Sequence, residues 1–181
     1  DRIFEIFDWR SRVQEAQNPV QMRRFSNQLE FRNVSFAYPD APGRLVLKNV
    51  SFTVPRQKVV AIVGASGAGK SSIVSLIARI FDVNTGCITL DGYNIKDVAF
   101  GDLRGLIAVV SQDVFLFNDT IEENIRCGRL EATMEEIHEA AKCANALEFV
   151  KSLPDGFKTV IGDRGQKLSG GERQRVSIAR A

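Results

Sequence analysis

Residues 58–71 contain an apolar run that leads directly into a glycine-rich loop, and they read Lys58-Val59-Val60-Ala61-Ile62-Val63-Gly64-Ala65-Ser66-Gly67-Ala68-Gly69-Lys70-Ser71. The run 58–63 is rich in β-branched residues, which favours a strand buried on both faces of a parallel sheet. Residues 64–71 match G-x-x-x-x-G-K-[ST], and residues 71–81 follow with apolar side chains at helical spacing. We therefore expect a strand, a tight loop and a helix in that order, which is the first half of a βαβ unit.

Each part of this loop suits the binding of a phosphate. Its glycines can adopt positive φ, which turns successive backbone N–H groups inward around an anion. The following helix directs its positive end to the same place, Lys70 adds a point charge, and Ser71 offers a hydroxyl ligand for Mg²⁺. The pattern predicts a nucleotide site formed by Gly64, Ala65, Ser66, Gly67, Ala68, Gly69, Lys70, Ser71 and Ser72. By itself it leaves small kinases, GTPases and many ATPases open.

The composition of the 181 residues is that of a soluble globular domain, with 44% hydrophobic and 25% charged residues. The net charge of +2 gives no support for a nucleic-acid partner. No apolar run approaches the roughly 20 residues that span a bilayer. The three cysteines show no metal or redox spacing, so we expect reduced thiols.

The rest of the chain predicts several further elements. Apolar alternation in residues 29–36 and 46–54, with turn residues between them, predicts a small antiparallel sheet. Residues 87–91 and 106–110 are further short strands, and residues 120–150 are helical, with capping boxes that begin at Thr120 and Thr133. We expect residues 1–28 to form a short helix and a linker outside the core.

A second glycine turn opens a helix near the end of the chain, where residues 168–172 read Leu168-Ser169-Gly170-Gly171-Glu172. Ser169 and Glu172 fit a capping box, and the free glycine N–H groups at the start of a helix form a second anion site.

The loop 64–71 together with residues 168–172 resembles the nucleotide-binding domain of an ATP-binding cassette (ABC) protein. The resemblance implies an α/β P-loop NTPase fold with a mixed sheet core. It also implies an N-terminal antiparallel β subdomain and a helical subdomain at about 113–170. Both belong to a partial ATP-binding domain that covers residues 29–181. The resemblance implies ATP and Mg²⁺ as cofactors. It also implies a head-to-tail dimer with a second ABC nucleotide-binding domain, in which Leu168, Ser169, Gly170, Gly171 and Glu172 contact the nucleotide of the partner.

Other residues extend the resemblance to exporters. Tyr38 resembles the aromatic residue that stacks on adenine, and Gln112 resembles the glutamine that reaches Mg²⁺ or the attacking water. Residues 159–165 resemble the loop that touches the transmembrane part, and residues 1–8 resemble the stretch that follows the last transmembrane helix. The expected function is ATP-driven export of a lipid or drug-like substrate, with a transmembrane domain in the same polypeptide. The expected location is the cytoplasmic face of a membrane, in the bacterial inner membrane.

The family also requires an acidic Walker B strand and a switch histidine after residues 168–172, and the sequence ends at Ala181. Asp91 precedes Gln112, which is the wrong order for the Walker B acid, and it stands in an Asp-Gly turn pair. His138 falls within a predicted helix, where we expect it at the surface. We therefore name no catalytic residue, and we expect this chain alone to be an unstable and inactive nucleotide binder.

Three alternatives remain. A DNA-repair type of ABC ATPase carries long insertions between its two motifs, and none is present between Ser71 and Leu168. A non-catalytic nucleotide-binding module is favoured by the lack of a catalytic acid. A soluble importer-type subunit is disfavoured by the linker-like residues 1–28.

Overall fold

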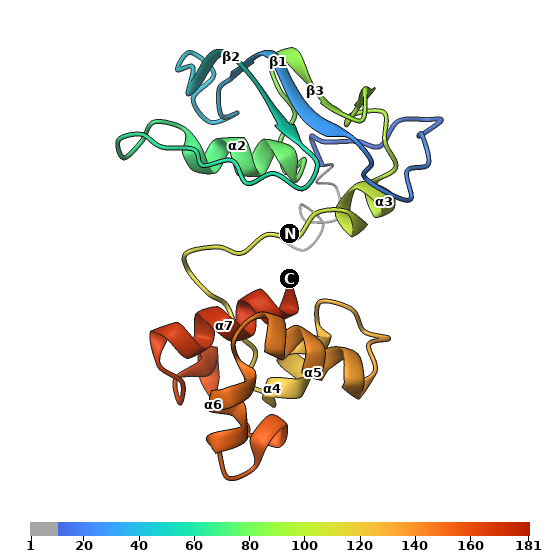
Figure 1. The fold of residues 1–181 in the computed structure, drawn as a ribbon. Coiled ribbons are helices and arrows are strands. Elements are labelled where there is room, and N and C mark those ends of the chain that lie inside the picture. The colour runs from blue at the N-terminus through green and yellow to red at the C-terminus, as the bar shows by residue number, and fades with distance from the viewer. Residues whose placement is uncertain (1–10) are drawn as a thin grey trace, which may run out of the picture. The chain divides into compact units, whose positions relative to one another are not determined.

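The computed structural model describes residues 11–181, which form two compact units divided between Ala108 and Val109 (Figure 1). Each unit has its own cluster of buried apolar side chains. The short helix expected at the N-terminus falls on residues 1–10, outside the described residues. Across the described part, no helix is long and apolar enough to cross a membrane.

The first unit is built on an antiparallel sheet with the strand order β2-β1-β3-β4. Its strands are β1 (Gln28–Phe36), β2 (Leu47–Pro55), β3 (Thr85–Leu90) and β4 (Tyr93–Asn94). The predicted pairing of 29–36 with 46–54 is confirmed, with Phe31 opposite Phe52 and their rings stacked at 4.4 Å. The predicted strand at 87–91 is confirmed as β3, which pairs with the other side of β1.

Two helices complete this unit, α2 (Lys70–Ile77) and α3 (Phe100–Gly105). Ile73 and Leu76 of α2 belong to the same buried cluster as Phe31 of the sheet, and Figure 1 shows α2 alongside the sheet. The predicted helix extends to residue 81, but α2 ends at Ile77. Arg79 adopts a left-handed φ of 50°, and the N–H groups of Arg79 and Ile80 fold back onto carbonyls of α2, which is a Schellman-type termination.

The predicted strands at 58–63 and 106–110 are wrong for this structure, because neither run forms a strand. The side chain of Val59 is 100% exposed and that of Val63 is 88% exposed. A strand buried on both faces needs hydrogen-bonded neighbours and covering layers, and within residues 11–181 no strand pairs with either run. The parallel part of the expected mixed sheet is therefore not formed in the described residues, where every paired strand is antiparallel.

Residues 14–27, which we call the strap, form the part of the first unit that precedes β1 and contain no helix. Val20 forms a parallel bridge with Val98, and the backbone N–H of Met22 donates to Asp102 at 2.7 Å. Met22 is buried in the core of this unit. The expectation that residues 1–28 lie outside the core is wrong for Met22, because long-range backbone contacts that no local pattern reveals hold the strap in place.

The second unit is helical. It contains α4 (Ile121–Arg126), α5 (Met134–Cys143), α6 (Leu147–Ser152) and α7 (Gly170–Arg180), with short 3-10 turns at Gly156–Lys158 and Asp163–Gly165. The helix α7 packs against α4 and α5 through Val176 and Ala179, which are buried with Ile121, Ile125 and Ile137. The predicted helical block 120–150 is confirmed as helical but is broken into three helices.

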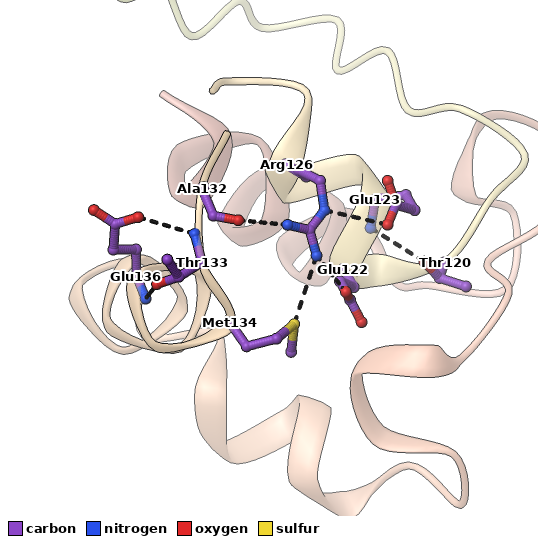
Figure 2. A network of polar contacts seen from close by, with 8 residues as sticks. All are labelled: Thr120, Glu122, Glu123, Arg126, Ala132, Thr133, Met134 and Glu136. Atoms are coloured by element: carbon purple, nitrogen blue, oxygen red, sulfur yellow. Dashed lines mark hydrogen bonds and ion pairs between the residues drawn. The ribbon is translucent and has the colours of Figure 1, made fainter. Parts of the chain in front are cut away.

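Arg126 holds the connection between α4 and α5, as Figure 2 shows. Its guanidinium contacts Glu122 and Glu123 on its own helix and donates to the carbonyl oxygen of Ala132. The predicted capping box at Thr133 is complete, whereas the one at Thr120 is half formed. At Thr120 the backbone N–H donates to Asp119 Oδ1 at 2.7 Å, and the Glu123 carboxylate accepts from Arg126 in its place.

Candidate functional site

The glycine loop of the first unit opens the helix α2 and has the backbone geometry of an anion cradle. Gly67 and Gly69 adopt φ of 80° and 88°, a region that L side chains rarely enter. A Cβ on Gly69 would lie 2.7 Å from a methyl group of Leu47, so packing on β2 also requires glycine there. A Cβ on Gly67 would meet no atom within 4 Å, because that side of the loop is open.

The start of α2 leaves donors free for a ligand. The backbone N–H groups of Lys70, Ser71 and Ser72 donate to no acceptor in the described part of the chain. Lys70 Nζ donates to the carbonyl oxygens of Gly64 at 2.9 Å and Ala65 at 2.7 Å, which holds the ammonium group inside the loop and leaves one of its three N–H donors free. This site fits a phosphate group, because it offers free backbone N–H groups, the positive end of a helix and the fixed ammonium group of Lys70.

The hydroxyl of Ser71 fits a magnesium ligand. Ser71 is exposed, and its side chain makes no hydrogen bond with the residues that the structure describes. Mg²⁺ is commonly held by one or two protein oxygens together with substrate phosphates and water. The other predicted metal ligand, Gln112, belongs to the second unit and is exposed there.

Tyr38 lines a cavity beside the phosphate loop. The cavity has a volume of about 240 Å³ and is also lined by Gly67, Arg44 and Val46. The ring of Tyr38 is half-buried and nearly perpendicular to the rings of Phe36 and Phe81, at centroid distances of 4.9 and 5.3 Å. The structure therefore brings Tyr38 and the predicted loop together around one space.

Sequence reasoning missed two features of this cavity. Arg44 contributes to its lining, and in the described residues the guanidinium of Arg44 has no hydrogen-bond or ion-pair partner. Ser72 Oγ lies 2.8 Å from the hydroxyl oxygen of Tyr38. Neither feature is part of a sequence motif, and the contact between Tyr38 and Ser72 joins residues that lie 34 positions apart in the sequence.

The second predicted motif forms the N-terminus of α7. The capping box is complete, since Glu172 N–H donates to Ser169 Oγ at 3.3 Å and Ser169 N–H donates to Glu172 Oε2 at 2.7 Å. These backbone and hydroxyl contacts with Ser169 lower the pKa of Glu172 and keep it ionised. Leu168 is buried under the turn, whereas Ser169, Gly170 and Gly171 are exposed.

Gln112 shares a cavity with this turn within the second unit. The cavity has a volume of about 370 Å³, and its lining includes Gln112, Asp113, Gly170 and Arg173. Arg173 donates to the Leu168 carbonyl oxygen at 2.8 Å, so its guanidinium is fixed at the edge of the turn. Arg173 was not singled out from the sequence, although it directly follows the predicted motif.

The two residues set aside as catalytic candidates have other roles. The Asp91 carboxylate accepts hydrogen bonds from the backbone N–H groups of Ser26, Asn27 and Gln28. Asp91 and Gly92 both adopt positive φ in the turn between β3 and β4, which confirms the predicted turn pair. His138 lies exposed on α5 and stacks on Phe157 at 4.3 Å, which confirms its surface position.

A glycine loop with this geometry at the start of a helix defines the chain as a P-loop nucleotide-binding protein. The model of the family described as "ABC transporter" matches residues 47–181. The chain therefore belongs to the ABC transporter family.

Individual relatives agree with this membership. The ATP-dependent lipid A-core flippase of Syntrophus aciditrophicus is 48% identical over 180 residues, which cover 99% of this chain and 30% of the relative. The ABC transporter B family member 2 of Dictyostelium discoideum is 46% identical over 99% of this chain and 13% of its own length. The chain thus spans a third or less of the relatives it matches.

A solved structure of a bacterial Atm1-family ABC exporter with ATP bound matches 99% of this chain and 31% of the exporter chain. The TM-score is 0.92 at 42% sequence identity. This likeness confirms the predicted fold class, that of a P-loop ABC ATPase.

Proposed function

We propose that the chain binds ATP with Mg²⁺ and serves as the ATP-hydrolysing part of a longer membrane exporter. The observation that carries the proposal is the loop 64–71, where free amides at the start of α2 and the held ammonium of Lys70 converge on an open space. The similar solved structure is described with ATP bound, which supports ATP as the nucleotide.

In this proposal different residues of the first unit bind the phosphates, the magnesium ion and the base. The amides of Lys70, Ser71 and Ser72 and the ammonium of Lys70 receive the phosphates, and the Ser71 hydroxyl holds the magnesium ion, which offsets phosphate charge when bound. Tyr38 stacks on the base from the edge of the 240 Å³ cavity. For Gln112, which belongs to the second unit, we propose the role that the resemblance implies, as a magnesium ligand or through the attacking water.

In this proposal the turn 168–172 binds the nucleotide of a second ABC domain in a head-to-tail dimer. The exposed Ser169, Gly170 and Gly171 offer a hydroxyl and backbone N–H groups at the start of α7. ATP then favours the closed dimer, because only that state supplies both sets of contacts.

The longer protein carries a transmembrane domain in the same polypeptide and works at the cytoplasmic face of a membrane, for which we propose the bacterial inner membrane. Relatives named as a lipid A-core flippase and as an exporter support this proposal. We propose a lipid or drug-like substrate. The 181-residue chain alone is expected to bind nucleotide without turnover, which a phosphate-release assay measures.

Calorimetric titration of the chain with Mg-ATP tests the proposed binding directly. We expect saturable binding that Lys70→Ala weakens roughly tenfold to a hundredfold, since a charged hydrogen bond contributes about 1.5–3 kcal/mol. Lys58→Ala is the matched control, because Lys58 is an exposed lysine near the loop whose side chain has no partner among the described residues. Equal affinities for the two variants would contradict the proposed site.

A further inference from the structure

The hydroxyl groups of Tyr38 and Ser72 form a contact that the proposed site does not explain. Their oxygens lie 2.8 Å apart, and either can be the donor. Ser72 is only 4% exposed, so water does not readily replace Tyr38 as the partner of its hydroxyl. A buried hydroxyl without a partner is costly, so the Ser72 hydroxyl depends on Tyr38 as its partner.

This contact joins the two ends of the proposed nucleotide site. Tyr38 lines the cavity where the base would stack, and Ser72 is the third residue of α2, directly after the proposed magnesium ligand Ser71. Phe36 and Phe81 pack against the Tyr38 ring. The ring is therefore held by two aromatic neighbours at its sides and by one hydrogen bond at its tip.

We propose that Ser72 is a positioning residue, whose hydroxyl fixes the Tyr38 ring for base stacking and does not bind phosphate. The proposal rests on the proposed nucleotide site and deepens it. A ring fixed before binding loses less freedom when a base stacks on it, which strengthens binding without adding a contact to the ligand. The phosphates are then left to the backbone amides at the start of α2 and to Lys70.

Binding measurements with two ligands distinguish positioning of the Tyr38 ring by Ser72 from binding of phosphate by Ser72. Mg-ATP uses both the Tyr38 ring and the phosphate loop, whereas inorganic tripolyphosphate with Mg²⁺ uses the loop alone. Tyr38→Phe and Ser72→Ala each remove one half of the hydrogen bond and keep the rest of the side chain or helix. We expect each variant to weaken Mg-ATP binding by up to about tenfold, because fixing the ring cannot contribute more to binding than the net free energy of the hydrogen bond that fixes it. We expect tripolyphosphate affinity to stay unchanged.

The double variant adds an independent criterion. If the two hydroxyl groups act only on each other, Tyr38→Phe combined with Ser72→Ala binds Mg-ATP no more weakly than either single variant. This double-mutant cycle on Mg-ATP decides the question even if tripolyphosphate binds too weakly to measure. Circular dichroism melts of every variant check that the fold is retained.

Matched controls come from the same unit. Ser75 lies one turn further along α2, and its hydroxyl makes no hydrogen bond with the described residues, so Ser75→Ala should leave both ligands unaffected. Tyr93 is exposed on β4, so Tyr93→Phe should also leave both unaffected.

The outcomes distinguish this inference from the function on which it rests. Additive losses in the double variant, or equal losses for tripolyphosphate and Mg-ATP in Ser72→Ala, would overturn the positioning role while nucleotide binding stands. A wild-type chain that binds neither ligand would overturn the proposed function itself.

Discussion

At the scale of single residues, the carboxylate of Asp91 holds the end of the strap against the turn between β3 and β4. It accepts the backbone N–H groups of Ser26 at 2.6 Å, Asn27 at 2.7 Å and Gln28 at 2.9 Å. Burial raises the pKa of Asp91, but the three N–H donors and the charge of Arg56 outweigh burial, so its pKa lies below the ordinary value. The ionised form is therefore the one that stabilises the fold.

We expect Asp91→Asn to lower the free energy of unfolding by about 1–2 kcal/mol at pH 7, because an amide has one acceptor oxygen where the carboxylate uses two. Because the pKa is lower in the folded state, the contribution of Asp91 is complete above the unfolded carboxyl value of about 3.9 and is lost as the pH falls through the folded value. Urea titrations at several pH values should show the two proteins converging in acid.

Asp97→Asn is the control for this measurement, because the exposed Asp97 side chain has no hydrogen-bond partner in the described residues. A difference between wild type and Asp91→Asn that stays unchanged down to the lowest pH at which both proteins still fold would show that the charge of Asp91 is not what holds the strap.

The sequence alone predicts the structural role of some of these residues and not of others. The turn pair at Asp91 and Gly92 is predicted because an Asp-Gly pair has local backbone preferences. The contacts of Asp91 with residues 26–28, and of Tyr38 with Ser72, are not predictable in this way. Each joins positions that only the folded chain brings together.

At the scale of elements, the two complete capping boxes offer a comparison between equivalent helix starts. Ser169 and Glu172 begin α7, and Thr133 and Glu136 begin α5, with the same pair of reciprocal contacts. Both motifs are predictable from sequence, because each box depends on residues only three positions apart. Their structural roles are alike, but only the α7 box belongs to the proposed dimer contact.

We expect Ser169→Ala and Thr133→Ala each to destabilise the chain by about 1 kcal/mol, the usual effect of losing an N-cap side chain. In addition, Ser169→Ala should weaken ATP-driven dimerisation more than it weakens ATP binding to the monomer. Thermal melts measure the first effect, and sedimentation velocity with and without Mg-ATP measures the second.

Thr133→Ala serves as the control for dimerisation, because it removes an equivalent cap from a helix outside the proposed contact. If both variants weaken dimerisation equally, the loss reflects stability alone and Ser169 has no role in binding the partner's nucleotide.

The run 58–63 shows that local sequence is not sufficient to predict a strand. Its β-branched residues favour a strand, yet Val59 and Val63 are exposed and no strand forms. A central strand depends on its neighbours, so its own residues are not sufficient. The pairing of β1 with β2 is predictable because the alternation in residues 29–36 and 46–54, with turn residues between them, indicates two half-buried neighbouring strands.

At the scale of the whole chain, apolar side chains exposed in both units bear on stability. Val59, Val60 and Val63 are exposed in the first unit, and Val109 and Val110 are exposed in the second. Contiguous exposed apolar surface promotes association and lowers the effective stability of an isolated chain.

We therefore expect the isolated chain to unfold below about 50 °C, near the lower end of the range for mesophilic domains. It should also bind a hydrophobic dye at 20 °C, and Val59→Lys combined with Val63→Lys should reduce that dye binding without lowering the transition temperature. A cooperative transition well above 50 °C with no dye binding would contradict this expectation. Circular dichroism and dye fluorescence provide the two readings.

The central claim is that the loop 64–71 and the start of α2 form the ATP site, and hydrogen exchange measured by mass spectrometry tests it most directly. The backbone N–H groups of Lys70, Ser71 and Ser72 are free in the described residues, so they should exchange quickly in the absence of ligand. Mg-ATP at a concentration just sufficient to saturate the wild type should slow exchange across residues 66–72 in the wild type and much less in Lys70→Ala, whose affinity is expected to be lower. Exchange in this segment that Mg-ATP leaves unchanged would contradict the account.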